Sequence, residues 1–462
     1  MRARVAPVLV FGTIALGCAG VGDVQVNYGP VGSVDAAADV APSDLGADVA
    51  IAGSDVPAGT DVVITPDAGS SADTTPTSSC AAQAAACRAV QKGCLVDATG
   101  KATCKQCPRG QAPLGDLATC GTIPGTALSH DFGTITLKPG EELNGWCQSW
   151  EINNPEELWV QTVEFRSDGG YHHSNWIIIP QGATLWTNPK TGQKEEYPAG
   201  LWKKCYSQGF HEVDAAIAGG VLYAQSTQIA NEIQKFPDGV AVRVPPYSRV
   251  IAATHLLNIL PNELATNLQL LFYTVPLADV KVKLTPFQLD FHDLQLPPKA
   301  SSSFTASCDF RGPYDALGLD APFAPKLYYA LPHYHAMGTG FVLEIVGGVD
   351  HGKVLIDNSG YGPDPYGRLF DPPVDLSSAD GLKFSCKYQN PTDKTIHFGV
   401  ADGEMCMMLG FVESPTTFVS TVLSVDPKQT LVADGMTKFS GSCLAGAVPF
   451  PQDKPGGTPL PK

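Results

Sequence analysis

The stretch LWVQTVEF at residues 158–165 decides the fold class, because it gathers aromatic, β-branched and other apolar residues in a short run that ends at the turn sequence SDGG, 167–170. Runs of the same kind recur at 267–273 (NLQLLFY) and 341–346 (FVLEIV). Short apolar or alternating runs between Pro, Gly, Asn and Asp indicate β-strands, and many of them in series are typical of antiparallel sandwiches. From about residue 122 onward we therefore predict an all-β fold.

The β region divides into two halves of similar size. The sequence LQLPP at 294–298 indicates that a new unit has begun shortly before it. We therefore predict two tandem antiparallel, jelly-roll-like β-sandwich domains, at 122–285 and 286–447. The Pro-rich end, 448–462, is predicted to be an unstructured tail. One weak helix is expected, at 212–218.

The start of the chain has the composition of an export signal. Two arginines precede an apolar run and then small residues, which predicts a signal peptide at 1–17. The sequence ALGC at 15–18 resembles a bacterial lipobox, in which the signal is cut before a cysteine that is then lipidated. Ordinary secretion with a free Cys18 is the alternative. Residues 18–79 are rich in Ala, Asp, Gly, Ser and Thr and predict a disordered acidic tether.

Cysteine usage supports export. Setting aside Cys18 leaves 12 of the 13 cysteines, an even number that suits an oxidising compartment. Residues 80–121 hold a dense group of them, which predicts a small disulfide-rich module whose connectivity is left open. Its members are Cys80, Cys87, Cys94, Cys104, Cys107 and Cys120. We expect an outer-membrane lipoprotein of the bacterial cell envelope, or an extracellular protein, that meets the membrane only through its lipid.

The charge excludes some partners. A formal net charge of −16 would repel nucleic acid and anionic membrane surfaces, so neither is expected as a partner. A hydrophobic fraction of 44% is ordinary for globular material and sufficient for a sizeable core. We expect a monomer.

Two short histidine clusters are candidates for metal binding. His172 and His173 are adjacent, so both can reach one ion only at a strand end or a bulge, which the preceding glycines allow. His333 and His335 are two residues apart, and such residues on a strand project from one face and can chelate together. Paired strand histidines without a metal are the alternative in both cases.

The segment GEMCMM at 403–408 holds three of the six methionines. A methionine run in a strand is usually core filler, but a thioether is also a soft ligand suited to Cu(I). Beside two imidazoles it would form a copper site that can change oxidation state. The spacing does not distinguish which methionine would bind.

In their order, these motifs resemble the copper type II ascorbate-dependent monooxygenases, the family that includes peptidylglycine α-hydroxylating monooxygenase and dopamine β-monooxygenase. The resemblance covers about residues 140–445. His172-His173 is similar to the family's His-His pair, and THLLN at 254–258 to its later single histidine, His255. HYHAMG at 333–338 is similar to its His-x-His motif, with Met337 in place of a leucine, and Glu404-Met405-Cys406 to its Glu-Met-Cys.

The resemblance implies two copper ions per chain. One would be bound by His172, His173 and His255, and would store an electron from a donor such as ascorbate. The other would be bound by His333, His335 and Met405, the catalytic set, where dioxygen reacts with a carbon–hydrogen bond of the substrate.

The resemblance also implies three disulfides. They are Cys147–Cys205 in the first domain, and Cys308–Cys443 and Cys386–Cys406 in the second.

The substrate is left open. Leu331 stands where the peptide-amidating branch has an arginine that helps to hold the substrate carboxylate, which argues against a peptidylglycine substrate. A small or peptide-like molecule of unknown identity is expected. The main alternative function is a non-catalytic extracellular copper-binding lipoprotein, because the same ligands would be present in it. A purely structural sandwich, such as an adhesin, is a third reading, which the full set of motifs disfavours.

Overall fold

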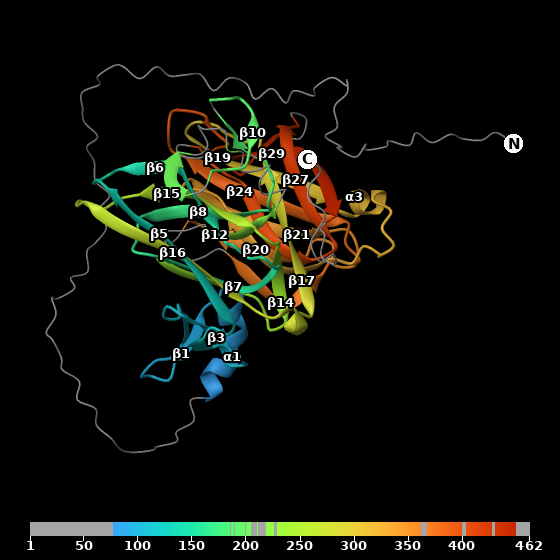
Figure 1. Ribbon diagram of the computed structural model, residues 1–462. Coiled ribbons are helices and arrows are strands. Elements are labelled where there is room, and N and C mark those ends of the chain that lie inside the picture. Colours follow the sequence, from blue (N-terminus) through green and yellow to red (C-terminus); the bar gives the residue numbers. More distant parts are fainter. Residues whose placement is uncertain are drawn as a thin grey trace, which may run out of the picture. The chain divides into compact units, whose positions relative to one another are not determined.

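The structure, a computed structural model, describes residues 77–449 except 185, 189, 199, 205–209, 211–218, 226–228, 362–366, 400–402 and 427–429. The expected signal peptide, Cys18, nearly all of the expected tether, the expected helix at 212–218 and Cys205 lie outside the described residues. Within them the fold is all-β, as predicted, with few helical segments (Figure 1). No helix among these residues is long and apolar enough to cross a membrane.

The disulfide-rich module begins with a helix that the sequence analysis did not predict. Its elements are α1 (Thr77–Ala89), β1 (Gly93–Val96), β2 (Ala102–Lys105), β3 (Gln111–Leu114) and β4 (Thr119–Thr122). Strand β1 pairs with β2, and β3 with β4, both antiparallel. All six cysteines are paired, as Cys80–Cys94, Cys87–Cys104 and Cys107–Cys120. The alanine-rich sequence of α1 favours a helix, since alanine has the highest helix propensity.

The first half packs two sheets around a hydrophobic core. One is a five-stranded sheet of order β11-β6-β15-β8-β12, and the other side holds β13, β14, β7, β16 and β5. The strands are β5 (Thr126–Leu137), β6 (Glu142–Glu151), β7 (Leu158–Ser167), β8 (Tyr171–Ile179), β9 (Trp186–Thr187), β10 (Lys194–Glu195), β11 (Gly200–Lys204), β12 (Val221–Gln225), β13 (Asn231–Lys235), β14 (Val240–Val244), β15 (Arg249–Leu257) and β16 (Leu264–Thr274). A 3-10 turn, η2 (Leu277–Asp279), follows.

The second half has its own hydrophobic core, formed mainly by residues 287–422. Its elements are β17 (Val282–Phe291), β18 (Gln295–Leu296), β19 (Ala300–Asp309), α3 (Arg311–Ala316), β20 (Lys326–His333), β21 (Gly338–Val346), β22 (Val354–Ser359), β23 (Arg368–Asp375), β24 (Gly381–Asn390), β25 (Ile396–His397), β26 (Met407–Glu413), β27 (Thr416–Val425), β28 (Leu431–Ala433) and β29 (Met436–Pro449). Strand β29 extends into the first residues of the expected tail.

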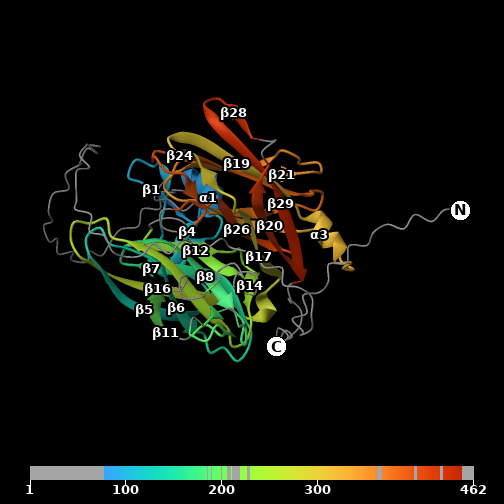
Figure 2. The same cartoon turned by 90° about the horizontal axis from the view of Figure 1, so that it is seen from above.

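Strand β17 belongs to both halves. Its first residues pair in parallel with β14 of the first half, and its remainder pairs with β26 and β27 of the second half. The expected domain boundary at 285/286 therefore falls inside a strand, and one 16-stranded sheet is continuous between the two halves. Figure 2 shows the strands of the first half in teal to yellow-green and most of those of the second half in gold to red.

Disulfides tie the second half together. Cys308 is joined to Cys443, and Cys386 to Cys406, which are the two pairs that the resemblance implied for this half. Cys147 of the first half is also disulfide-bonded.

Candidate metal centre

A β-bulge places the adjacent histidines of the first half on one side of the sheet. On β15 and β8, His255 pairs with His173 and Leu256 pairs with Tyr171, so that His172 is the extra residue. A bulge interrupts the alternation of side chains between the two faces of a sheet. The ring centroids of His172 and His173 are 5.4 Å apart.

A second bulge lies on the other side of His255. Thr254 pairs with Trp146 and His255 pairs with Asn144, so that Gly145, at φ 63°, is the extra residue of β6 at this point. His255 therefore lies between two bulged strands, with its ring 4.6 Å from that of His173 and 5.0 Å from that of His172.

The two histidines of the second half lie at the end of a strand. Strand β20 ends at His333, and His335 lies in the turn that follows, rather than further along the same strand as the sequence had indicated. Their ring centroids are nevertheless 5.3 Å apart, and both side chains are buried.

The five histidines form one cluster. The ring of His173 lies 5.1 Å from that of His333 and 4.7 Å from that of His335. Among the described residues, His173, His333 and His335 form a group suited to holding a metal ion, with ligand nitrogens all within 4.8 Å of one another. His173 belongs to the first ligand set that the resemblance implied, and His333 and His335 belong to the second. The imidazoles of the two implied sets are therefore in direct proximity.

The imidazoles are held neutral by their burial. Desolvation lowers the pKa of His172, His255 and His335 to about 4, and it lowers that of His173 and His333 well below the usual value. The neighbouring imidazoles act in the same direction on His173, because several positive charges in a buried cluster would repel each other. At neutral pH the cluster therefore offers uncharged nitrogens, the form that binds metals.

The tautomer of His335 is fixed by its partner. Its Nδ1 lies 2.9 Å from the carbonyl oxygen of Gly403, and since a carbonyl can only accept, Nδ1 carries the proton and donates. The lone pair is then on Nε2, which is buried and makes no hydrogen bond to the described residues. In histidine metal ligands, one ring nitrogen usually donates to a carbonyl or carboxylate and the other binds the metal, and His335 has this arrangement.

His255 has the same kind of support from a carboxylate that the sequence analysis missed. Its Nε2 lies 2.5 Å from Oε1 of Glu142, at the start of β6. A carboxylate accepts, so Nε2 carries the proton and Nδ1 faces Nε2 of His173 at 2.8 Å. Glu142 is 113 residues from His255, and only the β6–β15 pairing brings them together.

Glu404 holds the turn that carries His335. Its buried carboxylate accepts from the backbone N–H of His335 at 2.9 Å, of Met337 at 2.8 Å and of Met405 at 3.3 Å. Burial nevertheless raises its pKa to about 7. The resemblance singled out this residue as part of a motif without a role, and the structure gives it one.

Met405 is buried and held at its backbone. Its carbonyl oxygen accepts a hydrogen bond of 2.6 Å from the hydroxyl of Tyr388, and the next residue, Cys406, is tied to Cys386. Through Glu404, the segment of Met405 is joined directly to the turn of His335.

A tyrosine from the second half meets the first. The hydroxyl of Tyr361 lies 3.3 Å from Nε2 of His172, and the rings are 6.2 Å apart. The sequence offered no signal for this contact, because Tyr361 lies in a loop 189 residues away.

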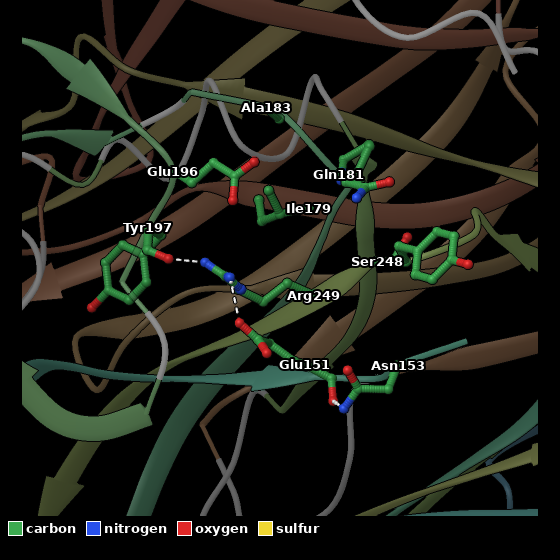
Figure 3. A pocket seen from close by; sticks show the side chains of 11 residues that line it. Glu151, Asn153, Ile179, Gln181, Ala183, Glu196, Tyr197, Ser248 and Arg249 are labelled. Atoms are coloured by element: carbon green, nitrogen blue, oxygen red, sulfur yellow. Dashed lines mark hydrogen bonds and ion pairs between the residues drawn. The ribbon is translucent and has the colours of Figure 1, made fainter. Parts of the chain in front are cut away.

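A polar pocket of about 240 Å³ lies at the other end of the same strands (Figure 3). Arg249 lines it, donates to the Tyr197 carbonyl and forms an ion pair with Glu151 at 2.7 Å. Arg249 begins β15, six residues before His255, so about 20 Å of extended strand separates the two. The pocket is therefore not part of the histidine cluster.

Comparisons with known proteins leave the family open. No family model matches the chain, and no curated protein matches it. Among solved structures it is similar to the major capsid protein P2 of bacteriophage PM2, at 10% identity and a TM-score of 0.24 over 61% of this chain and 97% of that one. It is also similar to a structure of Sulfolobus Turreted Icosahedral Virus, at 11% identity and a TM-score of 0.24 over 62% of this chain and 90% of that one. The PBSX exported protein XepA matches at 10% identity and a TM-score of 0.15 over 70% of this chain and 98% of that one. Likenesses this weak carry no argument about function.

Proposed function

We propose that the chain is a copper-dependent monooxygenase that hydroxylates a carbon–hydrogen bond of a small or peptide-like substrate, with dioxygen and a reductant such as ascorbate. In this reaction one oxygen atom enters the C–H bond and the other leaves as water, with two electrons from the reductant and two protons. The proposal includes two copper ions, one with His172, His173 and His255 and the other with His333, His335 and Met405.

The observation that carries the proposal is the convergence of five imidazoles from distant parts of the chain. His172 and His335 are 163 positions apart in the sequence, yet both lie in one cluster, in which four imidazoles are buried and His172 is partly buried, and in which burial favours the neutral form of all five. Burying so many polar rings costs free energy unless their nitrogens form hydrogen bonds or bind a metal, and neutral imidazole is a common ligand for copper and zinc. Met405 follows Glu404, whose carboxylate holds the turn of His335, and a thioether ligand from this methionine would favour copper, since zinc has no preference for such a soft ligand.

Residues of this chain would prepare the site. The Gly403 carbonyl keeps the proton of His335 on Nδ1 and leaves Nε2 to bind. Glu142 keeps the proton of His255 on Nε2, and Glu404 fixes the turn that carries His335. Copper bound there would supply the one-electron chemistry that dioxygen activation requires.

The described surroundings bear on the substrate. Leu331 is buried in the first hydrophobic core and offers no group for a carboxylate. This supports a substrate other than a peptide with a C-terminal glycine.

We also propose that the protein acts in the bacterial cell envelope or outside the cell, attached through a lipid on Cys18. The disulfides support an oxidising compartment, because such bonds are rare in the cytosol. Replacing Cys18 with alanine is expected to abolish incorporation of a radiolabelled fatty acid.

A non-catalytic copper-binding protein is the second candidate. The burial of the nitrogens favours it, since His333 is only 2% exposed and a substrate would need access. Turnover separates the two candidates.

The test is metal content together with oxygen consumption. We expect the copper-loaded protein to hold two coppers per chain, to show a sulfur scatterer in X-ray absorption on reduction, and to consume dioxygen with ascorbate and a substrate. Met405→Ile should abolish turnover and retain the copper of the first site, whereas Met436→Ile, on β29 and paired with β19 and β28, should change neither. If the protein binds copper but turns over no substrate in a broad screen, the non-catalytic copper-binding protein is the remaining candidate. Absence of copper would refute both candidates.

A further inference from the structure

The disulfide-rich module packs on the outer face of the first half. Ala112 of the module and Ile123, directly after β4, form a small hydrophobic cluster with Ile233 of β13 and with Leu271 and Tyr273 of β16. Helix α1 also contacts β23 of the second half. The module therefore touches both halves that contribute histidines.

One buried carboxylate joins the module to the sheet. Glu164 of β7 is fully buried, and its oxygens accept from Nε of Arg166 at 2.8 Å, Nη2 of Arg166 at 2.7 Å and the hydroxyl of Tyr273 at 2.8 Å. The remaining donor comes from the module, since the backbone N–H of Gly110 lies 2.8 Å from Oε1 of Glu164. A buried carboxylate with four donors is a strong and well-placed anchor.

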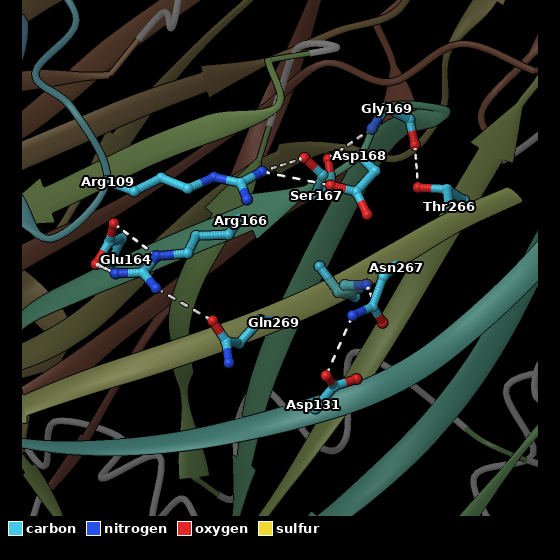
Figure 4. Close-up of polar contacts among 11 residues, drawn as sticks. Arg109, Asp131, Glu164, Arg166, Ser167, Asp168, Gly169, Thr266, Asn267 and Gln269 are labelled. Carbon is cyan, nitrogen blue, oxygen red and sulfur yellow. Dashed lines mark hydrogen bonds and ion pairs between the residues drawn. The ribbon is translucent and has the colours of Figure 1, made fainter.

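Arg109, which directly precedes Gly110 in the module, contacts the turn between β7 and β8. Nη2 of Arg109 donates to the carbonyl oxygen of Ser167 at 2.9 Å and lies 3.5 Å from Oδ1 of Asp168 (Figure 4). Arg109 and Gly110 follow closely on Cys107, which the disulfide to Cys120 fixes. The module thus presents two consecutive residues to two neighbouring places on the sheet.

This turn leads directly into the bulged histidines. Gly170 has φ 77°, a left-handed backbone conformation that favours glycine, and a Cβ there would press on the side chain of Leu264. The hydroxyl of Thr266 donates to the carbonyl of Gly169, and the N–H of Leu257 donates to that of Gly170. His172 follows two residues later, at the bulge that decides which way its ring projects.

We propose that the disulfide-rich module positions the histidine cluster, with Arg109 as the positioning residue that acts through the turn at 167–170. The inference rests on the proposed metal centre and goes beyond it, because it assigns a role to a module that contributes no metal ligand. Arg109 touches neither metal nor substrate. It sets the start of β8, and so the direction of His172 and His173.

The decisive variant is Arg109→Gln in the full chain, with Arg88→Gln as the matched control. Arg88 is also an arginine of the module, but within the part of the chain that the structure describes its Nη1 donates inside the module, to the carbonyl oxygens of Gly115 and Asp116. Arg109→Lys keeps the charge and can restore one of the two contacts, so it should rescue in part. Arg109 is half exposed, and all three variants are expected to fold.

The first readout is hydrogen exchange of the backbone amides at 167–173 in metal-free protein. We expect exchange there about tenfold faster in Arg109→Gln, with no change in Arg88→Gln. The second readout is titration with Cu(II) sulfate alone, followed by electron paramagnetic resonance. Loss of one hydrogen bond from a charged donor should lower Cu(II) affinity about fivefold to tenfold and shift the signal of the first site.

Each outcome decides one question. Unchanged hydrogen exchange at the turn in Arg109→Gln would overturn the positioning role. Faster exchange spread evenly over the chain would overturn it too, because that result would mean only a general loss of stability. Wild-type protein that takes up no Cu(II) would refute the proposed function, and exchange at the turn would still decide whether Arg109 positions it.

Discussion

Replacing Glu164 with glutamine should detach the module from the sheet. Each carboxylate oxygen accepts two hydrogen bonds, and the amide keeps only one acceptor oxygen. The NH₂ group of the glutamine would then face two hydrogen-bond donors that it cannot accept from, and two of the four hydrogen bonds of Glu164 would be lost. Hydrogen bonds to a charged group are each worth about 1.5 to 3 kcal/mol, so the loss of two of them should lower the free energy of unfolding by about 3 to 6 kcal/mol.

The assay is urea unfolding of the full chain followed by tryptophan fluorescence, with the m-value checked for two-state behaviour. A matched variant, Glu164→Gln combined with Arg166→Met, removes both charged partners together. It should recover part of the loss, because an uncompensated buried charge costs more than an absent pair. A loss below about 1 kcal/mol in Glu164→Gln would show that the apolar contacts hold the module without this carboxylate.

Two further predictions concern stability. Burial raises the pKa of Glu232 to about 8 in the folded chain from an ordinary 4.5, so the folded state binds the extra proton and stability should fall as pH rises from about 4.5 to 8. Glu232→Gln should remove most of that slope, which amounts to on the order of 5 kcal/mol, and an unchanged thermal-melting profile between pH 5 and 9 would contradict the assignment. Cys308→Ala with Cys443→Ala opens a loop of 135 residues and should lower the unfolding free energy by about 5 kcal/mol, measured by urea denaturation against Cys386→Ala with Cys406→Ala, whose 20-residue loop predicts about 3 kcal/mol.

Local patterns in the sequence were enough for the fold class. The run at 158–165 is strand β7, and those at 267–273 and 341–346 lie in β16 and β21. The spacing of Cys80 and Cys87 indicates a disulfide-rich module but no secondary structure, whereas the alanine-rich sequence between them has the high helix propensity that forms α1.

The site was predictable where its residues lie close together in the sequence. The bulge at His172 follows from adjacent histidines after two glycines, and His333 with His335 follows from their spacing. Glu142 and Tyr361 could not be found in this way, because each meets its histidine across more than 100 residues, through strand pairing or a loop contact that one sequence does not encode locally. The closeness of the two implied ligand sets also depends on how the halves pack.

Strand β17 restricts how the protein can move. Because the start of β17 is hydrogen-bonded to β14 and its remainder to β26 and β27, opening the molecule like a hinge at this point would require breaking the backbone ladder between β14 and β17. Such a rupture is far more costly than a rotation about a free linker. The continuous sheet holds β20, which carries His333, and β7, which shares a hydrophobic core with β8 and β15, the strands of the histidines of the first half. The relative position of the imidazoles is therefore set by backbone pairing and core packing and not by a flexible connection.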